Sequence, residues 1–156
     1  YVTVTGVQTC ALPIFIAVTG HNESLQQRLE DFHEIPLKVY GFTDDVPELL
    51  LAADVVVTKA GGLTAAETLI AGCGYIIYKP LPGQETGNAV FLEEHCAAQV
   101  AHSPQEVQAL VCEYAAADAD VRAEARKRRS LAYGKPEAAA EISNYILRNL
   151  KKEVKT

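Results

Sequence analysis

The chain has 156 residues, of which 49% are hydrophobic and 22% are charged, and its formal net charge at pH 7 is -6. This length suits one domain with a single core, and the composition excludes disordered and collagen-like proteins. The negative charge argues against a nucleic-acid partner, because duplex-binding domains carry an excess of Lys and Arg. No apolar run approaches the roughly 18 residues that span a bilayer, which predicts a soluble chain.

The first residues are interpreted apart from the rest. Val4 to Ile14 is similar to the translation of a sequencing-library adapter, so we expect residues 1–14 to be a non-native leader. The native domain, residues 15–156, would then begin near Phe15. The alternative is a genuine edge strand, because Tyr1 to Thr5 alternates apolar and polar residues.

Short apolar runs alternate with helical patterns along the remaining chain. Expected strands cover 15–19, 37–40, 54–58, 75–78 and 98–100. Expected helices cover 23–32, 46–53, 64–71 and 86–94, and helical sequence with breaks runs from 104 to about 152. This alternation predicts an α/β fold, a Rossmann-like parallel sheet with helices on both faces.

Unusual segments follow the expected strands. In a parallel sheet of this kind, ligands bind outside the carboxyl ends of the strands, so these loops should converge on one binding edge. The segments are Gly20-His21-Asn22, Tyr40-Gly41-Phe42, Ala60-Gly61-Gly62 and Pro82-Gly83-Gln84-Glu85.

Gly61 and Gly62 stand where an apolar strand hands over to a helix. The first amides of a helix lack intrahelical partners and point outward with the positive end of the helix dipole, so this junction is a candidate diphosphate site. Glu67 lies one turn further on, where a carboxylate could hold ribose hydroxyls. The alternative is a plain turn in which Thr64 is the N-cap and Glu67 completes a capping box.

The other loops offer polar and aromatic groups. Gln84 and Glu85 place an amide beside a carboxylate, which suits sugar hydroxyls, although both could simply be solvated. Phe42 could lie against a base, although such an aromatic is more often part of a core. His21 and Asn22 could reach the phosphates or the sugar, although Asn22 or Ser24 could instead cap the following helix.

Metal and disulfide chemistry are not indicated. The four cysteines are widely spaced without a C-x-x-C motif, which fits a reducing cytoplasm, and the histidine spacing suggests no metal site. Arg126 to Arg129 is interpreted as a solvated helix face with the acidic neighbours Asp120 and Glu124, with contact to anionic lipid as the alternative.

Taken together, these motifs resemble the C-terminal lobe of glycosyltransferase family 28, and among its members the diacylglycerol sugar transferases. The resemblance covers about Phe15 to Val111. It is carried by Val39-Tyr-Gly-Phe-x-x-Asp-Val46, Ala53-Asp54, Thr58-Lys-Ala-Gly-Gly-Leu-Thr-x-x-Glu67, Tyr78-Lys-Pro-x-Pro-Gly-Gln-Glu85 and Gly87-Asn-Ala89.

The resemblance implies a GT-B glycosyltransferase whose C-terminal lobe binds a UDP-sugar and whose N-terminal lobe, expected to be absent here, binds the lipid acceptor. Glu67 would hold the ribose, and Phe42 and Thr43 would flank the uracil. The diphosphate would be held by Gly61, Gly62, Leu63 and Thr64, and the sugar by Gln84 and Glu85. Further candidates for ligand contact are Gly20, His21, Asn22 and Asn88. Neither a metal nor another cofactor is expected.

Two positions depart from the family pattern. Gly74 stands where a proline is usual, and Cys96 where a glycine is usual. The first would loosen the entry to a strand, and the second would be costly if the backbone there needs a positive φ.

The implied activity is transfer of a hexose from a UDP-sugar to a diacylglycerol-type lipid with inversion, by a cytoplasmic enzyme with peripheral contact at the inner membrane face. The base would belong to the absent lobe, so the isolated chain should be inactive. Three alternatives remain open. The first is a stand-alone UDP-sugar-binding subunit that needs a membrane-anchored partner, and the second is a UDP-N-acetylglucosamine transferase acting on a polyprenyl-linked acceptor. The third is a relative that shares only the fold and binds no sugar nucleotide.

Overall fold

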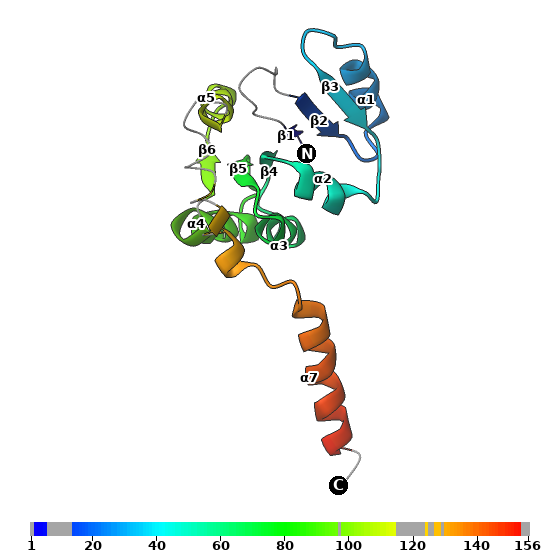
Figure 1. Cartoon of the computed structure of the whole chain (residues 1–156), viewed down its shortest axis with the longest axis vertical. Coiled ribbons are helices and arrows are strands. Elements are labelled where there is room, and N and C mark those ends of the chain that lie inside the picture. Colours follow the sequence, from blue (N-terminus) through cyan, green and yellow to red (C-terminus); the bar gives the residue numbers. More distant parts are fainter. Residues whose placement is uncertain are drawn as a thin grey trace.

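A computed structural model describes residues 2–5, 14–96, 98–114, 124, 127–128 and 130–153. Strands and helices alternate along most of this chain (Figure 1). The strands are β1 Val2–Thr5, β2 Ile14–Val18, β3 Leu37–Tyr40, β4 Val55–Thr58, β5 Gly74–Tyr78 and β6 Gln99–Ala101. The helices are α1 Glu23–Glu30, α2 Val46–Ala52, α3 Gly62–Ala71, α4 Gln84–Cys96, α5 Pro104–Tyr114 and α7 Ala138–Glu153.

The strands form one sheet in the order β3-β2-β1-β4-β5-β6. The predicted parallel pairing holds between β2 and β3, between β4 and β5, and between β5 and β6. The chain runs outward from β2 to β3, returns across the sheet, and continues outward on the other side from β4 to β6. The expected α/β architecture is confirmed, with the reversal of strand order lying between β2 and β4.

β1 corrects the prediction of a wholly parallel sheet. Val2–Thr5 lies in the middle of the sheet and is antiparallel to both neighbours, with Val2 opposite Ala17 and Val57. The alternative of an edge strand at residues 1–5 is therefore right that a strand forms, but wrong that it lies at the edge of the sheet. Only residues 6–13 connect β1 to β2, which is shorter than the dozen or more residues that a parallel crossover needs, so the two strands must be antiparallel.

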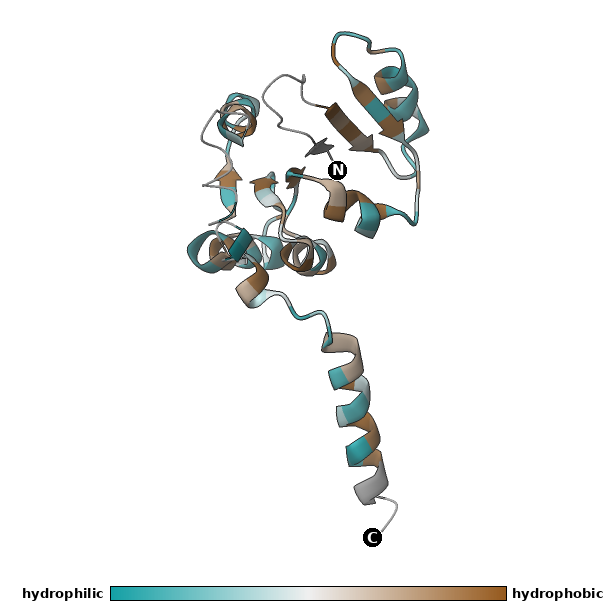
Figure 2. Cartoon of the chain, viewed as in Figure 1, coloured by the Kyte–Doolittle hydropathy of each residue, from teal (hydrophilic) through white to brown (hydrophobic). Residues whose placement is uncertain are grey.

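The two faces of the sheet carry separate apolar clusters. On one face Val56, Tyr75 and Ile77 pack with Leu50 of α2 and with buried residues of α3 and α4. On the other, Val55 and Ile76 pack with Tyr114 of α5 and with its apolar neighbours. This alternation follows from the period of two in a strand, and hydrophobic residues accordingly concentrate on β4 and β5 between helical layers (Figure 2).

Two helices begin earlier than predicted. α3 starts at Gly62, because Gly61 takes the extended N-cap conformation, with φ -68 and ψ 139, and its carbonyl accepts the Ala65 amide at 2.8 Å. Thr64 is therefore inside the helix, and the alternative of a capping box between Thr64 and Glu67 is wrong. α4 starts at Gln84, so Gln84 and Glu85 belong to its first turn and not to the preceding loop.

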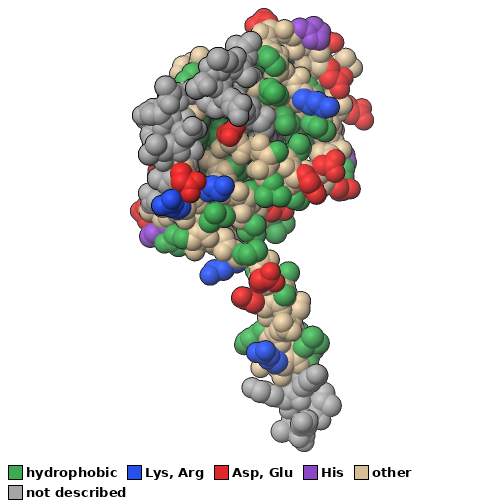
Figure 3. All heavy atoms as spheres, in the orientation of Figure 1, with side chains coloured by type: hydrophobic (Ala, Val, Ile, Leu, Met, Phe, Trp, Pro, Cys, Tyr) green, Lys and Arg blue, Asp and Glu red, His purple; other side chains and the backbone are tan. Residues whose placement is uncertain are grey.

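α7 extends away from the sheet and its helical layers (Figure 1). Its apolar side chains are exposed, among them Tyr145 at 71%, Ile146 at 51% and Leu150 at 55%. Hydrophobic side chains accordingly line the protruding helix in Figure 3. No described helix is long and apolar enough to cross a membrane.

Cys96 carries no backbone cost. Among the described residues, Lys79 is the one position other than glycine with a positive φ. Cys96 therefore has a negative φ, and its replacement of the usual glycine causes no backbone strain. Cys96 ends α4 and is 3% exposed in the core beside Leu92. A buried cysteine outside a disulfide behaves as a small apolar residue there.

Gly74 is required by its neighbour Tyr114. A Cβ at residue 74 would lie 2.3 Å from Cε1 of the Tyr114 ring, which is far inside contact distance. The Gly74 amide also donates to the Asp54 carbonyl at 2.8 Å, a bond that a proline at this position would lose. The Tyr114 ring and the hydrogen bond from Gly74 to Asp54 therefore fix the start of β5. They serve where the resemblance led us to expect a proline.

We predict that Gly74→Ala lowers the free energy of unfolding by about 1–3 kcal/mol, the usual cost of overpacking a core. Urea denaturation followed by circular dichroism measures the change. Gly87→Ala is the matched control, because Gly87 lies within α4 with no atom within 4 Å of its added Cβ. That variant should be more stable by up to about 1 kcal/mol, since alanine favours a helix. Equal effects at the two positions would contradict this account of Gly74.

Candidate functional site

The loops predicted to form a site follow the carboxyl ends of β2, β3, β4 and β5. β2 and β3 carry one pair of loops, and β4 and β5 carry the other. β1 lies between the two pairs, and Val2 at its start is opposite Ala17 and Val57, near the carboxyl ends of β2 and β4. The site therefore consists of two sets of residues on either side of the point where the strand order reverses, which is where such sheets bind ligands.

Gly61 and Gly62 leave open space at the start of α3. A Cβ on Gly62 would have no atom within 4 Å, and one on Gly61 would meet only Glu85 Oε1, at an ordinary contact distance of 3.7 Å. Neither glycine has a positive φ. Gly61 is the N-cap residue of α3, and as a glycine it has no side chain to accept an amide of the first turn. Packing and backbone conformation therefore do not explain why both residues are glycine, and the helix amides beside them are open to close approach.

α3 presents Leu63 and Glu67 to solvent and buries the opposite side. Leu63 is 84% exposed and Glu67 is also exposed, whereas Ala65, Thr68 and Leu69 pack into the core. Residues four apart lie on the same side of a helix, so Glu67 stands one turn beyond Leu63 on the surface that starts at the glycines. The carboxylate is thus accessible along the same helix that offers its first amides.

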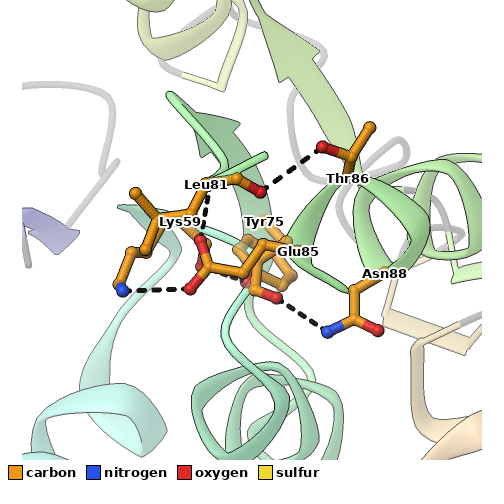
Figure 4. A network of polar contacts seen from close by, with 7 residues as sticks. Lys59, Tyr75, Leu81, Glu85, Thr86 and Asn88 are labelled. Carbon is orange, nitrogen blue, oxygen red and sulfur yellow. Dashed lines mark hydrogen bonds and ion pairs between the residues drawn. The ribbon is translucent and has the colours of Figure 1, made fainter. Parts of the chain in front are cut away.

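Four side chains connect the paired-glycine loop to β5 and α4 (Figure 4). The Tyr75 hydroxyl donates to the Lys59 carbonyl at 2.8 Å, and Asn88 Nδ2 donates to the Ala60 carbonyl at 3.0 Å. Lys59 Nζ lies 2.9 Å from Glu85 Oε1. We call Lys59, Tyr75, Glu85 and Asn88 the loop clamp, because together they fix the backbone directly before Gly61.

Glu85 is held by two groups within the protein. Its Oε2 accepts the Leu81 amide at 2.8 Å, and its Oε1 pairs with Lys59. The Leu81 hydrogen bond, followed by the Lys59 ammonium group, lowers the pKa of Glu85 below its ordinary value of 4.5. Gln84, the other residue predicted to contact a sugar, is exposed. The Glu85 carboxylate is thus occupied by partners within the protein, whereas the Gln84 side chain makes no such bond within the described residues. A contact of either residue with a sugar stays a prediction.

His21 and Phe42 form an exposed aromatic pair on the other side of β1. Their ring centroids are 4.7 Å apart with an angle of 9° between the planes, and Phe42 is 65% exposed. Thr19 supports this arrangement, because its amide and hydroxyl both donate to the Tyr40 carbonyl at the end of β3, at 2.9 and 3.1 Å. Phe42 is therefore not a core residue, and a planar base could lie on the free surface of the pair.

Three of the remaining candidates have local structural roles. The Asn22 side chain accepts the Leu25 amide at 3.0 Å, so Asn22 and not Ser24 caps α1. Thr43 Oγ1 exchanges hydrogen bonds with Asp45 before α2. Gly20 has a φ of 60, a conformation that suits glycine in the turn after β2.

Sequence reasoning missed Lys59, Tyr75 and Lys79. The first two form the loop clamp with Asn88 and Glu85, and no local pattern pairs Tyr75 with a carbonyl in the preceding loop. Lys79 has a φ of 50, which is uncommon outside glycine and occurs here directly after β5. The sequence did not predict this conformation of Lys79, because the proline at residue 80 favours extended backbone at the residue before it.

Other features lie away from this edge. A cavity of about 430 Å3 is bordered by Asp54, Gly72, Cys73 and Lys127 at the amino ends of β4 and β5, opposite the candidate site. Within the described part of the chain, no group of three His, Cys, Asp or Glu side chains could hold a metal ion. Arg128 pairs with Glu124 at 3.3 Å on an exposed helix face, as expected, while Asp120, Arg126 and Arg129 are outside the described residues.

Known bacterial proteins are similar in sequence to parts of this chain. The chain is 38% identical over 95 residues to the processive diacylglycerol beta-glucosyltransferase of Bacillus pumilus, which covers 59% of the chain and 25% of that protein. It is 34% identical over 135 residues to the protein of the same name in Bacillus mycoides, which covers 85% of the chain and 34% of that protein. The chain thus spans between a quarter and about a third of the length of these relatives.

Solved structures share the fold. MurG of Acinetobacter baumannii matches with a TM-score of 0.67 and 23% identity, over 85% of this chain and 40% of that one. The glycotransferase of kitacinnamycin matches with a TM-score of 0.52 and 19% identity, over 83% of this chain and 42% of that one. The sequence profile of the glycosyltransferase family 28 C-terminal domain matches residues 11–142. With the open glycines and the exposed Glu67 at the carboxyl edge of the sheet, this match shows that the chain belongs to glycosyltransferase family 28.

Proposed function

We propose that the parent protein transfers a hexose from a UDP-sugar to a diacylglycerol-type lipid with inversion, and that this chain is its donor-binding half. The observation that carries the proposal is the pair of glycines that neither packing nor backbone conformation requires, at the start of α3, where the N-cap residue Gly61 has no side chain to cap the helix. A diphosphate fits such a place, because helix amides and the helix dipole favour an anion.

The remaining groups suit the other parts of a nucleotide. Glu67 is an exposed carboxylate one turn along α3, at the position where the family pattern has its ribose-binding acid. The stacked pair of His21 and Phe42 offers a flat surface for uracil. Gln84, at the start of α4, is exposed and supplies both a donor and an acceptor for sugar hydroxyls.

The relatives support a lipid acceptor. The two bacterial proteins at 34% and 38% identity are named diacylglycerol glucosyltransferases, whereas MurG, at 23%, is a guide to the fold alone. We therefore prefer a diacylglycerol-type acceptor to a polyprenyl-linked one.

Bond cleavage places negative charge on the departing diphosphate. Preorganised amides at the start of α3 would stabilise that charge, and this mechanism requires no metal ion. We expect the base that removes the proton of the acceptor hydroxyl to lie outside this chain. The isolated chain should then bind UDP weakly without transferring sugar, and transfer by the isolated chain would contradict this division of roles.

We predict that Glu67→Ala costs about 1 to 3 kcal/mol in UDP affinity, because the ribose hydroxyls lose a charged partner. Isothermal titration with UDP and with its 2′,3′-dideoxy analogue separates this contact from a general effect, since the analogue should bind both proteins equally. Glu93→Ala is the control, because Glu93 is an exposed acid on α4 with the same charge. An unchanged UDP affinity for the Glu67 variant would remove this residue from the site.

We predict that Gly62→Ala weakens UDP binding by about tenfold or more without lowering stability. The added methyl group meets no protein atom within 4 Å but stands where a phosphate oxygen would approach, and overpacking of that kind costs about 1–3 kcal/mol. UDP titration and urea denaturation of the same sample measure both quantities, with Gly87→Ala as the control. Full UDP affinity in the Gly62 variant would place the diphosphate elsewhere.

A further inference from the structure

We propose that Lys59 is a diphosphate-binding residue, and that Glu85 holds its ammonium group near the paired glycines until a diphosphate replaces the carboxylate as the partner of Lys59. This inference rests on the proposed function, since it names the cation of the same site. It also gives Glu85 a role different from a sugar contact, namely that of a resident counter-ion.

One carboxylate oxygen of Glu85 lies close to both the Lys59 ammonium group and the first of the paired glycines. Glu85 Oε1 lies 2.9 Å from Lys59 Nζ and 3.7 Å from the position that a Cβ on Gly61 would take. Figure 4 shows this anionic oxygen directed toward the Lys59 ammonium group. A phosphate oxygen that approaches the start of α3 comes within reach of the same ammonium group.

The two partners differ in their freedom to move. The Glu85 side chain is only 13% exposed and its other oxygen is bonded to the Leu81 amide, whereas the Lys59 side chain is 53% exposed. Lysine carries its charge on a flexible four-carbon stem. Lys59 can therefore turn to a new anion while Glu85 stays in position.

The Lys59 backbone is fixed while its side chain turns. Tyr75 donates to the Lys59 carbonyl and Asn88 donates to the next carbonyl, that of Ala60. These bonds hold the start of the side chain at a constant distance from the helix amides. Tyr75 and Asn88 are thus positioning residues, and Lys59 is the group that contacts the ligand.

The charge of the ligand requires a cation in addition to the helix. A helix start offers about half an elementary charge, and a phosphate alone carries up to about two negative charges. The described loops that follow the strands contain two lysines and no arginine. Lys79 Nζ lies over the Tyr78 ring, 5.3 Å from its centre, whereas Lys59 directly precedes the glycine loop.

The ion pair itself has a measurable signature. Because the folded protein lowers the pKa of Glu85, the link from Glu85 to Leu81 and Lys59 is complete above pH 4.5 and is lost as the pH falls through the lower folded value. We predict that the Leu81 amide resonance follows this titration. Lys59→Met should raise the pKa of Glu85 only part of the way to 4.5, because the larger cause, the Leu81 hydrogen bond, remains. An unchanged titration would show that the pair does not form in solution.

The decisive experiment compares UDP with uridine on the full 156-residue chain by amide NMR titration up to millimolar ligand. We expect Lys59→Met to weaken UDP binding about tenfold, the usual worth of a hydrogen bond to a charged group, and to leave uridine binding unchanged. Lys59→Arg should keep most of the UDP affinity. Lys38→Met is the control, because it removes the same charge from an exposed position on β3.

Glu85→Gln separates ligand binding from a structural role of the pair. The glutamine can still accept the Leu81 amide, and Lys59 is released, so UDP should bind at least as tightly as in the unchanged chain. If Glu85→Gln weakened UDP as Lys59→Met does, or if Lys59→Met weakened uridine equally, the pair would only stabilise the loop and the inference would be overturned. UDP binding that survives Lys59→Met would overturn this inference alone, whereas no UDP binding by the unchanged chain would overturn the proposed function with it.

Discussion

The loop between β4 and α3 depends on side chains that come from outside it. Two backbone carbonyls directly before the paired glycines would have no partner within their own segment, and Tyr75 and Asn88 satisfy them from β5 and α4. A hydrogen bond of this kind contributes little net stability, but a carbonyl left unpaired would be costly, so the loop keeps one conformation. The amides at the start of α3 therefore face a constant direction without help from a ligand.

The same clamp explains how the proposed anion site is compatible with a chain that has an excess of acidic residues. Glu85 is placed close to the glycines, yet its charge is compensated by Lys59 and by the Leu81 amide. Paired in this way, the carboxylate does not repel an incoming phosphate as an isolated one would. The loop after β5 and the loop after β4 thereby act as one unit, which agrees with the pairing of these two strands as neighbours in the sheet.

The sheet also shows how strand direction follows from connection length. β1 lies between β2 and β4, and its short connection to β2 makes it antiparallel to that strand. Because β2 and β4 run in the same direction, β1 is antiparallel to β4 as well, whereas the pairings that do not involve β1 are parallel. The outer elements are less constrained. α7 buries little of its apolar surface against the remainder of the described chain, and its exposed Tyr145, Ile146 and Leu150 distinguish it from α2 to α5, which pack against the sheet or each other.

The sequence alone determined the order and type of the elements from Phe15 onward, because apolar runs of four or five residues and helical spacing are local properties. It also indicated the edge of the sheet that carries the candidate site, since the loops with the paired glycines, His21 and Phe42 all follow strands. Only the tertiary structure decided the rest. The direction of β1, the need for Gly74 beneath Tyr114, and the union of Lys59, Tyr75, Glu85 and Asn88 arise from contacts between residues far apart in the chain, which no local pattern records.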